Sequence, residues 1–207
     1  MIFSHKVIPD NLVVKIRNQN ISRTGSMSFL GVAIDEKLTF VDHIDELSRK
    51  VAKSVGIIYR ISSFIPETIL PNLYFSLIHS RLSYGITAWG GASDSNLLRL
   101  QKLHRRVLNL IPSAASCKIL NFSNIYKYFS CLKFFKSAKL GHHAYFSQII
   151  HDLLPVYNYN TQHAISGNVN IPIHRKTRCQ QSFLFKATFV WNNLPDGIKN
   201  CLSLSIF

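Results

Sequence analysis

Carboxylates and imidazoles are the groups of this 207-residue chain that could hold a metal ion or move protons, and the carboxylates are scarce. A two-metal site needs at least two carboxylates that converge on ions about 3.5–4 Å apart. The ten acidic residues include no Asp-Asp pair, and the neighbours Asp35 and Glu36 would point to opposite faces of a strand. Catalytic triads, phosphate-binding loops and dinucleotide fingerprints are also missing from the sequence. We therefore expect no catalytic residue, no metal site and no cofactor in this chain.

The cysteines are widely spaced. None of the four belongs to a Cys-x-x-Cys pair, so the usual ligand spacing of a zinc knuckle or ribbon cannot be drawn from them. We expect free, partly buried thiols.

Basic residues dominate the charge of the chain. There are 24 Lys and Arg residues against 10 Asp and Glu residues, which gives a formal net charge of +14. A field of this sign favours polyanionic partners such as nucleic acid or anionic lipid, although the charge could also serve solubility alone.

The longest apolar runs are interrupted well before the roughly 20 residues that a membrane-spanning helix needs. No secretory signal is evident at the N-terminus. We expect an intracellular protein without a membrane span, in the nucleus or the cytoplasm.

The clearest binding pattern lies in a helix expected from about residue 96 to 110. Apolar residues and His104 recur on one side, and four cations fall on the remaining surface: Arg99, Lys102, Arg105 and Arg106. Cations so placed can lie along a phosphate backbone and give salt-sensitive affinity that does not depend on sequence. The alternative is a basic helix face that is merely solvated.

Two further basic segments follow. Lys133, Lys136 and Lys139 recur every third residue beside aromatic residues, so this edge offers phosphate contacts or base stacking, although aromatic residues on such a helix usually pack in a core. Arg178 ends the cluster His174-Arg175-Lys176-Thr177-Arg178. Its guanidinium could clamp a phosphate or pair with a buried carboxylate.

Two elements at the start of the chain read as β-structure. Residues 7–21 predict a hairpin, because β-rich runs flank the turn-forming Arg17-Asn18-Gln19-Asn20. A second strand pair is expected to end at residues 29–34. Gly31 interrupts that apolar strand. A glycine in this position is typical of a bulge or of a close approach by another backbone. The alternative is a glycine that only relieves a strand crossing.

Helices are expected from residue 42 onward. Asp42 is a candidate N-cap, and apolar residues recur at spacings of three and four as far as Ile61. A second helix should begin near Pro66 and end near Tyr84-Gly85, and a loop through Trp89-Gly90-Gly91 should lead to the basic helix. A linker at 113–123, a helix over about 125–150 and a final apolar segment ending at Pro195 complete an expected α+β fold.

Five short signatures in a fixed order resemble a known family. They are Phe29-Leu30-Gly31-Val32-Ala33-Ile34-Asp35, Tyr84-Gly85 with Trp89-Gly90, Gln101-Lys102 before Arg105-Arg106, Thr177-Arg178, and Trp191-Asn192-Asn193-Leu194-Pro195. This order is similar to the C-terminal part of the reverse transcriptase of LINE-type, non-LTR retrotransposons, and most similar to jockey-like elements. The resemblance covers nearly the whole chain.

The resemblance implies a division into a palm remnant at 1–40, a helical thumb at 41–112 and a C-terminal connector region at 113–207. Phe29, Leu30 and Gly31 match the primer grip, the hairpin that holds the primer near the active site. The partners would be an RNA template and a DNA primer, and Mg²⁺ would belong to a palm site with catalytic aspartates upstream of these residues. The competing hypothesis is a structural or interaction remnant of a decayed element, with no role in nucleic-acid binding.

Overall fold

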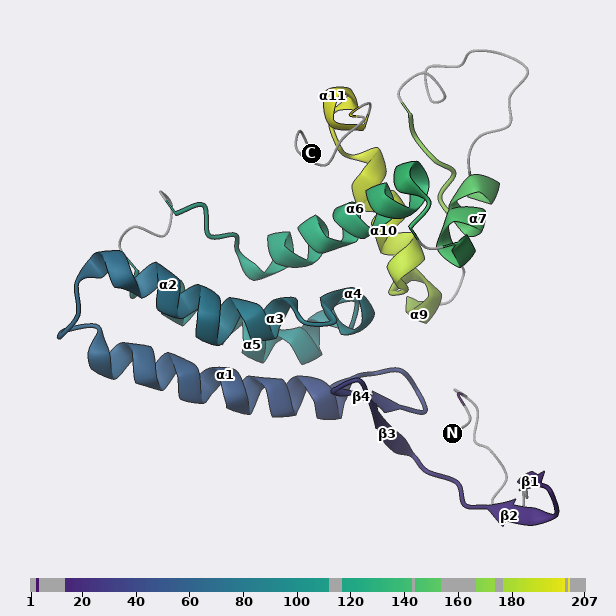
Figure 1. Cartoon of the computed structure of the whole chain (residues 1–207), viewed down its shortest axis with the longest axis horizontal. Coiled ribbons are helices and arrows are strands. Elements are labelled where there is room, and N and C mark those ends of the chain that lie inside the picture. Colours follow the sequence, from purple (N-terminus) through teal and green to yellow (C-terminus); the bar gives the residue numbers. More distant parts are fainter. Residues whose placement is uncertain are drawn as a thin grey trace. The chain divides into compact units, whose positions relative to one another are not determined.

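The computed structural model describes residues 3, 14–111, 117–142, 144–153, 167–173, 177–199 and 201 (Figure 1). The side chains of Ile16, Thr177 and Arg178 also lie outside the description. The chain forms two compact units. The first comprises Met1–Gly85 and Ala92–Ile119, and the second comprises Ile86–Gly91 and Leu120–Phe207. Two small antiparallel hairpins precede a series of helices, so the expected α+β class is confirmed.

The first hairpin pairs β1 (Val14–Ile16) with β2 (Gln19–Ile21). Its two turn residues, Arg17 and Asn18, have positive φ angles of 47° and 62°. Two successive positive φ angles are the mark of the tight turn whose twist matches that of paired strands. The predicted hairpin is therefore confirmed over 14–21, while residues 7–13 lie outside the described residues.

The second hairpin pairs β3 (Ser26–Phe29) with β4 (Val32–Asp35). Leu30 and Gly31 form its turn, with φ angles of 47° and 75°. The expected strand pair is confirmed, but the expected place of Gly31 inside a strand is wrong. Gly31 lies at the turn because a residue without Cβ adopts positive φ at little cost.

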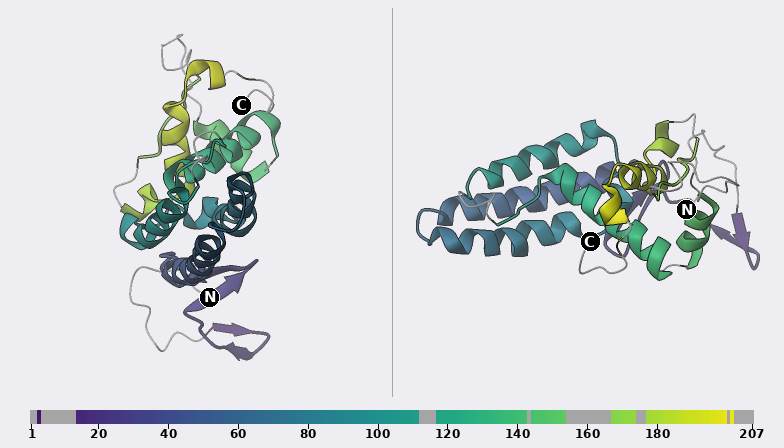
Figure 2. Two further views of the ribbon diagram at one scale, coloured as in Figure 1. Left: turned by 90° about the vertical axis from the view of Figure 1, so that its left-hand side faces the viewer. Right: turned by 90° about the horizontal axis from the view of Figure 1, so that it is seen from above.

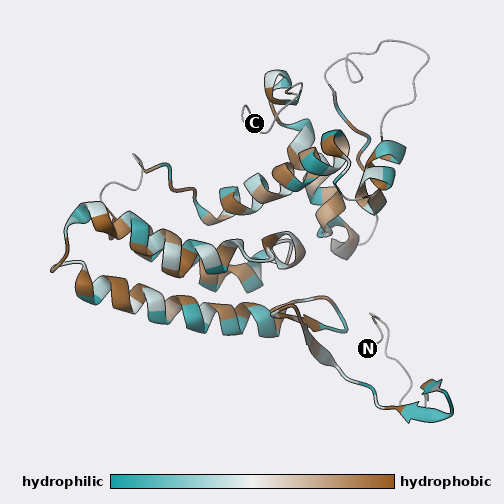
Figure 3. Cartoon of the chain, viewed as in Figure 1, coloured by the Kyte–Doolittle hydropathy of each residue, from teal (hydrophilic) through white to brown (hydrophobic). Residues whose placement is uncertain are grey.

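Helix α1 (Val41–Ile61) buries the apolar stripe that its sequence predicts, and alternating apolar and polar bands are visible along it (Figure 3). The predicted N-cap is wrong. Phe40 occupies that position, while Asp42 lies in the first turn. The carboxylate of Asp35 accepts hydrogen bonds from the backbone N–H groups of Thr39 at 2.9 Å and Phe40 at 2.6 Å. A side chain five residues upstream thus holds the chain just before the helix begins.

The second helical stretch is continuous from residue 67 to 83. A 3₁₀ turn η1 (Glu67–Ile69) leads into α2 (Leu70–Tyr74), a π-helical turn η2 (Phe75–His79) and α3 (Ser80–Ser83). Its end just before Tyr84-Gly85 agrees with the sequence prediction.

Helix α5 (Asp94–Leu108) begins two residues before the expected start, and Ser93 is its N-cap residue. The Tyr74 hydroxyl lies 2.8 Å from His104 Nε2, which joins α2 to α5. Arg81 Nη1 donates to the Lys50 carbonyl at 3.1 Å, which joins α3 to α1. The three helical segments of the first unit therefore run side by side (Figure 2).

The second unit contains α4 (Ile86–Trp89), α6 (Phe122–Leu140), α7 (Ala144–Leu153), α9 (Thr177–Gln180), α10 (Phe183–Asn192) and α11 (Asp196–Lys199). The loop expected through Trp89 is wrong in part, because Trp89 ends α4. The single helix expected over about 125–150 is also wrong. Gly141, with φ of 62°, ends α6 as a left-handed C-cap before α7 starts.

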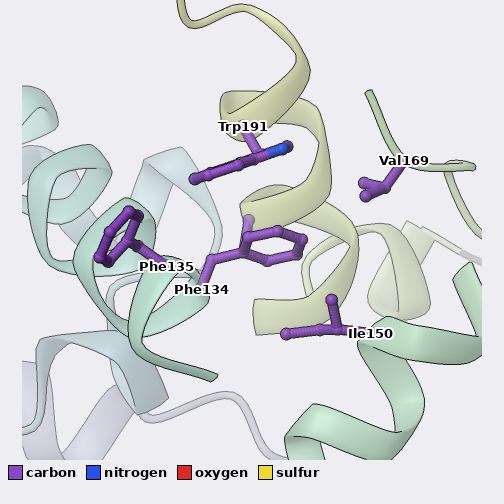
Figure 4. Close-up of a cluster of buried hydrophobic side chains, with 6 residues drawn as sticks. Phe134, Phe135, Ile150, Val169 and Trp191 are labelled. Carbon is purple, nitrogen blue, oxygen red and sulfur yellow. The ribbon is translucent and has the colours of Figure 1, made fainter. Parts of the chain in front are cut away.

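The core of the second unit gathers aromatic residues from α6 and α10. The rings of Phe134 and Trp191 lie with their centroids 4.9 Å apart, and Ile150 of α7 and Val169 lie beside them (Figure 4). The Trp191 indole N–H donates to the Gly167 carbonyl at 3.0 Å. Burial of Phe134 and Phe135 agrees with the packing alternative for the aromatic residues near the lysines of α6, whereas Tyr145 is 75% exposed and does not agree with it.

Candidate nucleic-acid interface

The four predicted cations of α5 all lie on its exposed side. At 100° per residue, Arg99, Lys102, Arg105 and Arg106 fall within an arc of roughly 120°, so they are not splayed around the helix. All four are exposed, whereas Leu97, Leu100, His104 and Val107 are buried on the opposite side. The arrangement is a basic ridge, defined by these four cations, backed by a packed core.

Arg99 differs from the other three. Its Nη1 atom lies 3.9 Å from Asp45 Oδ1 on α1, and both side chains are more than half exposed. An exposed pair at this distance contributes between about 0 and 1 kcal/mol. The ion pairs formed among described residues include none with Lys102, Arg105 or Arg106. Three charges of the ridge therefore remain available to a polyanion.

A groove of about 750 Å³ runs between α1 and α5 within the first unit. Lys102, Arg105 and Arg106 lie along its α5 side, and Gly56 and Tyr59 lie along its α1 side. Its remaining lining residues are Ala52, Val55, Leu103, Asn109 and Leu110. The sequence did not predict the contribution of Gly56 and Tyr59 to this groove, because only the packing of α1 against α5 places them opposite the cations.

The lysines of α6 differ from one another. Lys133 is half-buried, and its ammonium lies 4.7 Å from the ring centroid of Phe146 and 4.9 Å from that of Phe183. Burial also lowers the pKa of Lys133. Its charge is thus engaged within the fold. Lys136 is half-buried and Lys139 is exposed.

The remaining predicted residues lie elsewhere. The backbone of Arg178 is part of α9, but its side chain lies outside the described residues. At the tip of the second hairpin, Leu30 is 74% exposed and Phe29 is 58% exposed. The Tyr84 hydroxyl donates to the Leu30 carbonyl at 2.7 Å and so fastens this turn to the end of α3.

The adjacent acids Asp35 and Glu36 are both engaged in structural contacts. Burial alone would raise the pKa of Asp35, but hydrogen bonds from Thr39 and Phe40 outweigh it and leave that pKa lowered. Glu36 accepts two hydrogen bonds from Arg23, each 2.7 Å long, and these lower its pKa. Both carboxylates therefore accept hydrogen bonds within the fold.

The described parts of the chain contain neither a cluster of metal ligands nor a membrane-spanning helix. In those segments, no three His, Cys, Asp or Glu side chains come together in a group that could hold a metal ion. The described helices include none with the length and apolarity to cross a bilayer. Cys131 is buried, and Cys117, Cys179 and Cys201 are half-buried.

Part of this chain is similar to a known protein. A segment of 101 residues is 28% identical to the probable RNA-directed DNA polymerase from transposon X-element of Drosophila melanogaster. The match covers 47% of this chain and 11% of the Drosophila protein. No protein-family profile matches the chain, and no solved structure matches it. Half of this chain is therefore similar to a small part of a retrotransposon reverse transcriptase.

Proposed function

We propose that this chain is a reverse-transcriptase-like fragment that binds primed RNA template through the first unit and does not itself catalyse nucleotidyl transfer. The observation that carries the proposal is the basic ridge of α5. Three of its cations, Lys102, Arg105 and Arg106, line a groove, and the described residues of that groove include no carboxylate. Similarity to the Drosophila polymerase supports a nucleic acid as the polyanion. The contact would be to phosphates, and its affinity would fall steeply with salt.

The proposed subdomains follow the resemblance to LINE-type reverse transcriptases. Residues 1–40 would be the palm remnant, 41–112 the LINE-type thumb and 113–207 the connector. In the palm remnant, Leu30 has a backbone conformation that costs a branched residue energy, yet its side chain is 74% exposed. Strain of this kind often accompanies function, so we assign the turn Phe29-Leu30-Gly31 to contact with the primer.

A purely structural role is the second candidate. It is favoured by exposed apolar side chains in the first unit, among which Phe64 is 85% exposed and Leu30 is 74% exposed. Such side chains also suit contact with protein. In that case the basic ridge would contribute solubility only.

Binding of the full chain to a fluorescent primed RNA–DNA hybrid separates these two roles. The test variant replaces Arg99, Lys102, Arg105 and Arg106 by Ala, and the matched control replaces the exposed Lys15, Lys37, Lys118 and Lys127 by Ala. We expect the test variant to bind at least tenfold more weakly than the control, because both lose four charges but only one loses the ridge. Equal affinities would refute the interface.

A further inference from the structure

The groove between α1 and α5 has apolar walls in addition to its cations, and contact with a phosphate backbone alone does not require such walls. Its volume is about 750 Å³, and Ala52, Val55 and Leu103 supply apolar lining beside the cations. Small-molecule sites span about 300–1,000 Å³ and combine apolar walls with a few polar groups. The groove is therefore large enough for a planar ring as well as for phosphates.

An exposed aromatic ring stands on the α1 side of this groove. Tyr59 is 66% exposed, although it lines the groove and belongs to a helix whose other large apolar residues are mostly buried. Aromatic side chains that flank a cationic groove serve as platforms on which unpaired bases stack. The groove thus pairs a stacking surface on one helix with phosphate-binding charges on the other.

Gly56 keeps this side of the groove open. It lies in the middle of α1, where Gly is about 1 kcal/mol less favourable than Ala. A Cβ atom placed on Gly56 would meet nothing within 4 Å, so packing does not demand a glycine there. The absent side chain leaves the space beside Tyr59 unfilled.

We propose that the groove binds a single-stranded segment of nucleic acid, with an unpaired base stacked on Tyr59 and its flanking phosphates on Lys102, Arg105 and Arg106. This inference rests on the proposed function and assigns the groove to the unpaired, single-stranded part of a primed template. Charge complementarity selects a nucleic acid over an apolar peptide, because the described lining residues carry three positive charges and no negative one. A duplex, whose bases are already stacked in pairs, offers no ring to Tyr59.

The experiment compares two single strands of equal length and charge, one of oligothymidylate and one in which every base is replaced by an abasic site. The wild-type chain should bind oligothymidylate about fivefold or more tightly than the abasic strand, since stacking contributes to one complex only. Tyr59→Ala should bring this ratio close to one, and Tyr59→Phe should restore it.

Gly56→Leu provides a second, independent test. The branched side chain should occupy the groove and lower the ratio, whereas Gly56→Ala should retain it. A ratio near one for the wild-type chain, with binding that still depends on the ridge cations, would overturn stacking but leave the proposed function intact. Absence of binding to every strand and hybrid would overturn both.

Discussion

Arg99 of α5 lies beside Asp45 of α1, with 3.9 Å between Nη1 and Oδ1, and this contact sets it apart from its three basic neighbours. A phosphate that approaches Arg99 must compete with the carboxylate. We therefore expect Arg99→Ala to weaken hybrid binding less than twofold, and Arg106→Ala to weaken it about threefold or more. Equilibrium titration at one salt concentration measures both. A larger effect for Arg99→Ala would show that the ion pair does not form in solution.

Asp45 provides the reciprocal prediction. Asp45→Asn removes the competing charge without shortening the side chain, so it should tighten binding by about twofold at low salt. The gain should disappear when Arg99 is also replaced by Ala, and a double-mutant cycle measures this coupling. A gain that persists without Arg99 would point to a general effect of net charge.

The second hairpin predicts a conflict between stability and binding. Leu30 has φ of 47° and precedes Gly31, and Asn-Gly is the preferred pair for this kind of turn. Leu30→Asn should raise the free energy of unfolding by about 0.5–1 kcal/mol. If the exposed leucine contacts the primer, the same variant should bind the hybrid more weakly. Urea unfolding measures the change in stability, and titration of the hybrid measures the change in affinity. Unchanged binding would exclude Leu30 from the interface.

Two glycines should respond to alanine in opposite ways. Gly56→Ala should stabilise the chain by about 0.5–1 kcal/mol, because it raises helix propensity in open space. Gly90→Ala should destabilise it, because the new Cβ would lie 2.6 Å from the Ile86 carbonyl and against Tyr126. Thermal unfolding followed by circular dichroism compares them. Destabilisation by Gly56→Ala would mean that α1 is not a regular helix at this point.

Acid should destabilise the first unit through His104. Burial, together with the smaller effect of nearby His79, lowers the pKa of His104 to about 4, whereas an unfolded histidine titrates near 6.5. Because the unfolded chain takes up this proton first, stability is unaffected above about pH 6.5 and is lost as the pH falls from there towards 4. The loss from this group is at most about 3 kcal/mol.

The non-titrating variant His104→Gln isolates this contribution. Its unfolding free energy should vary less between pH 7 and 4 than that of the wild-type chain, although His43 and His79, whose pKa values burial also lowers, keep part of the slope. Urea unfolding at several pH values measures the difference. Identical slopes in the two proteins would show that His104 is accessible to protons in the folded state.

The sequence predicts long, strongly periodic elements well. Helix α1 is 21 residues long and carries its apolar stripe along most of this length, so the burial of the stripe could be predicted directly from the spacing. Its N-cap could not, because Asp35 reaches the helix start from a preceding strand and not from the expected position. The four-residue helix α4 is too short to show a period, and it was expected to be a loop.

The candidate site also contains residues that the sequence predicts and residues that it does not. The cations of α5 share one helix, so their common face follows from 3.6-residue periodicity. Tyr59 and Arg106 are 47 positions apart in the sequence and meet at one groove only because α1 packs against α5. Lys133 looked like an available cation because the sequence does not show that Phe146 and Phe183 approach it.

The salt dependence of hybrid binding tests the central claim most directly. The measurement compares the wild-type chain with the triple variant Lys102→Ala, Arg105→Ala and Arg106→Ala, and with a control that loses Lys15, Lys37 and Lys127. If these three ridge cations neutralise phosphates, the plot of log affinity against log salt should lose about two to three units of slope in the triple variant and about none in the control. A triple variant whose slope and affinity equal those of the control would contradict the proposed interface.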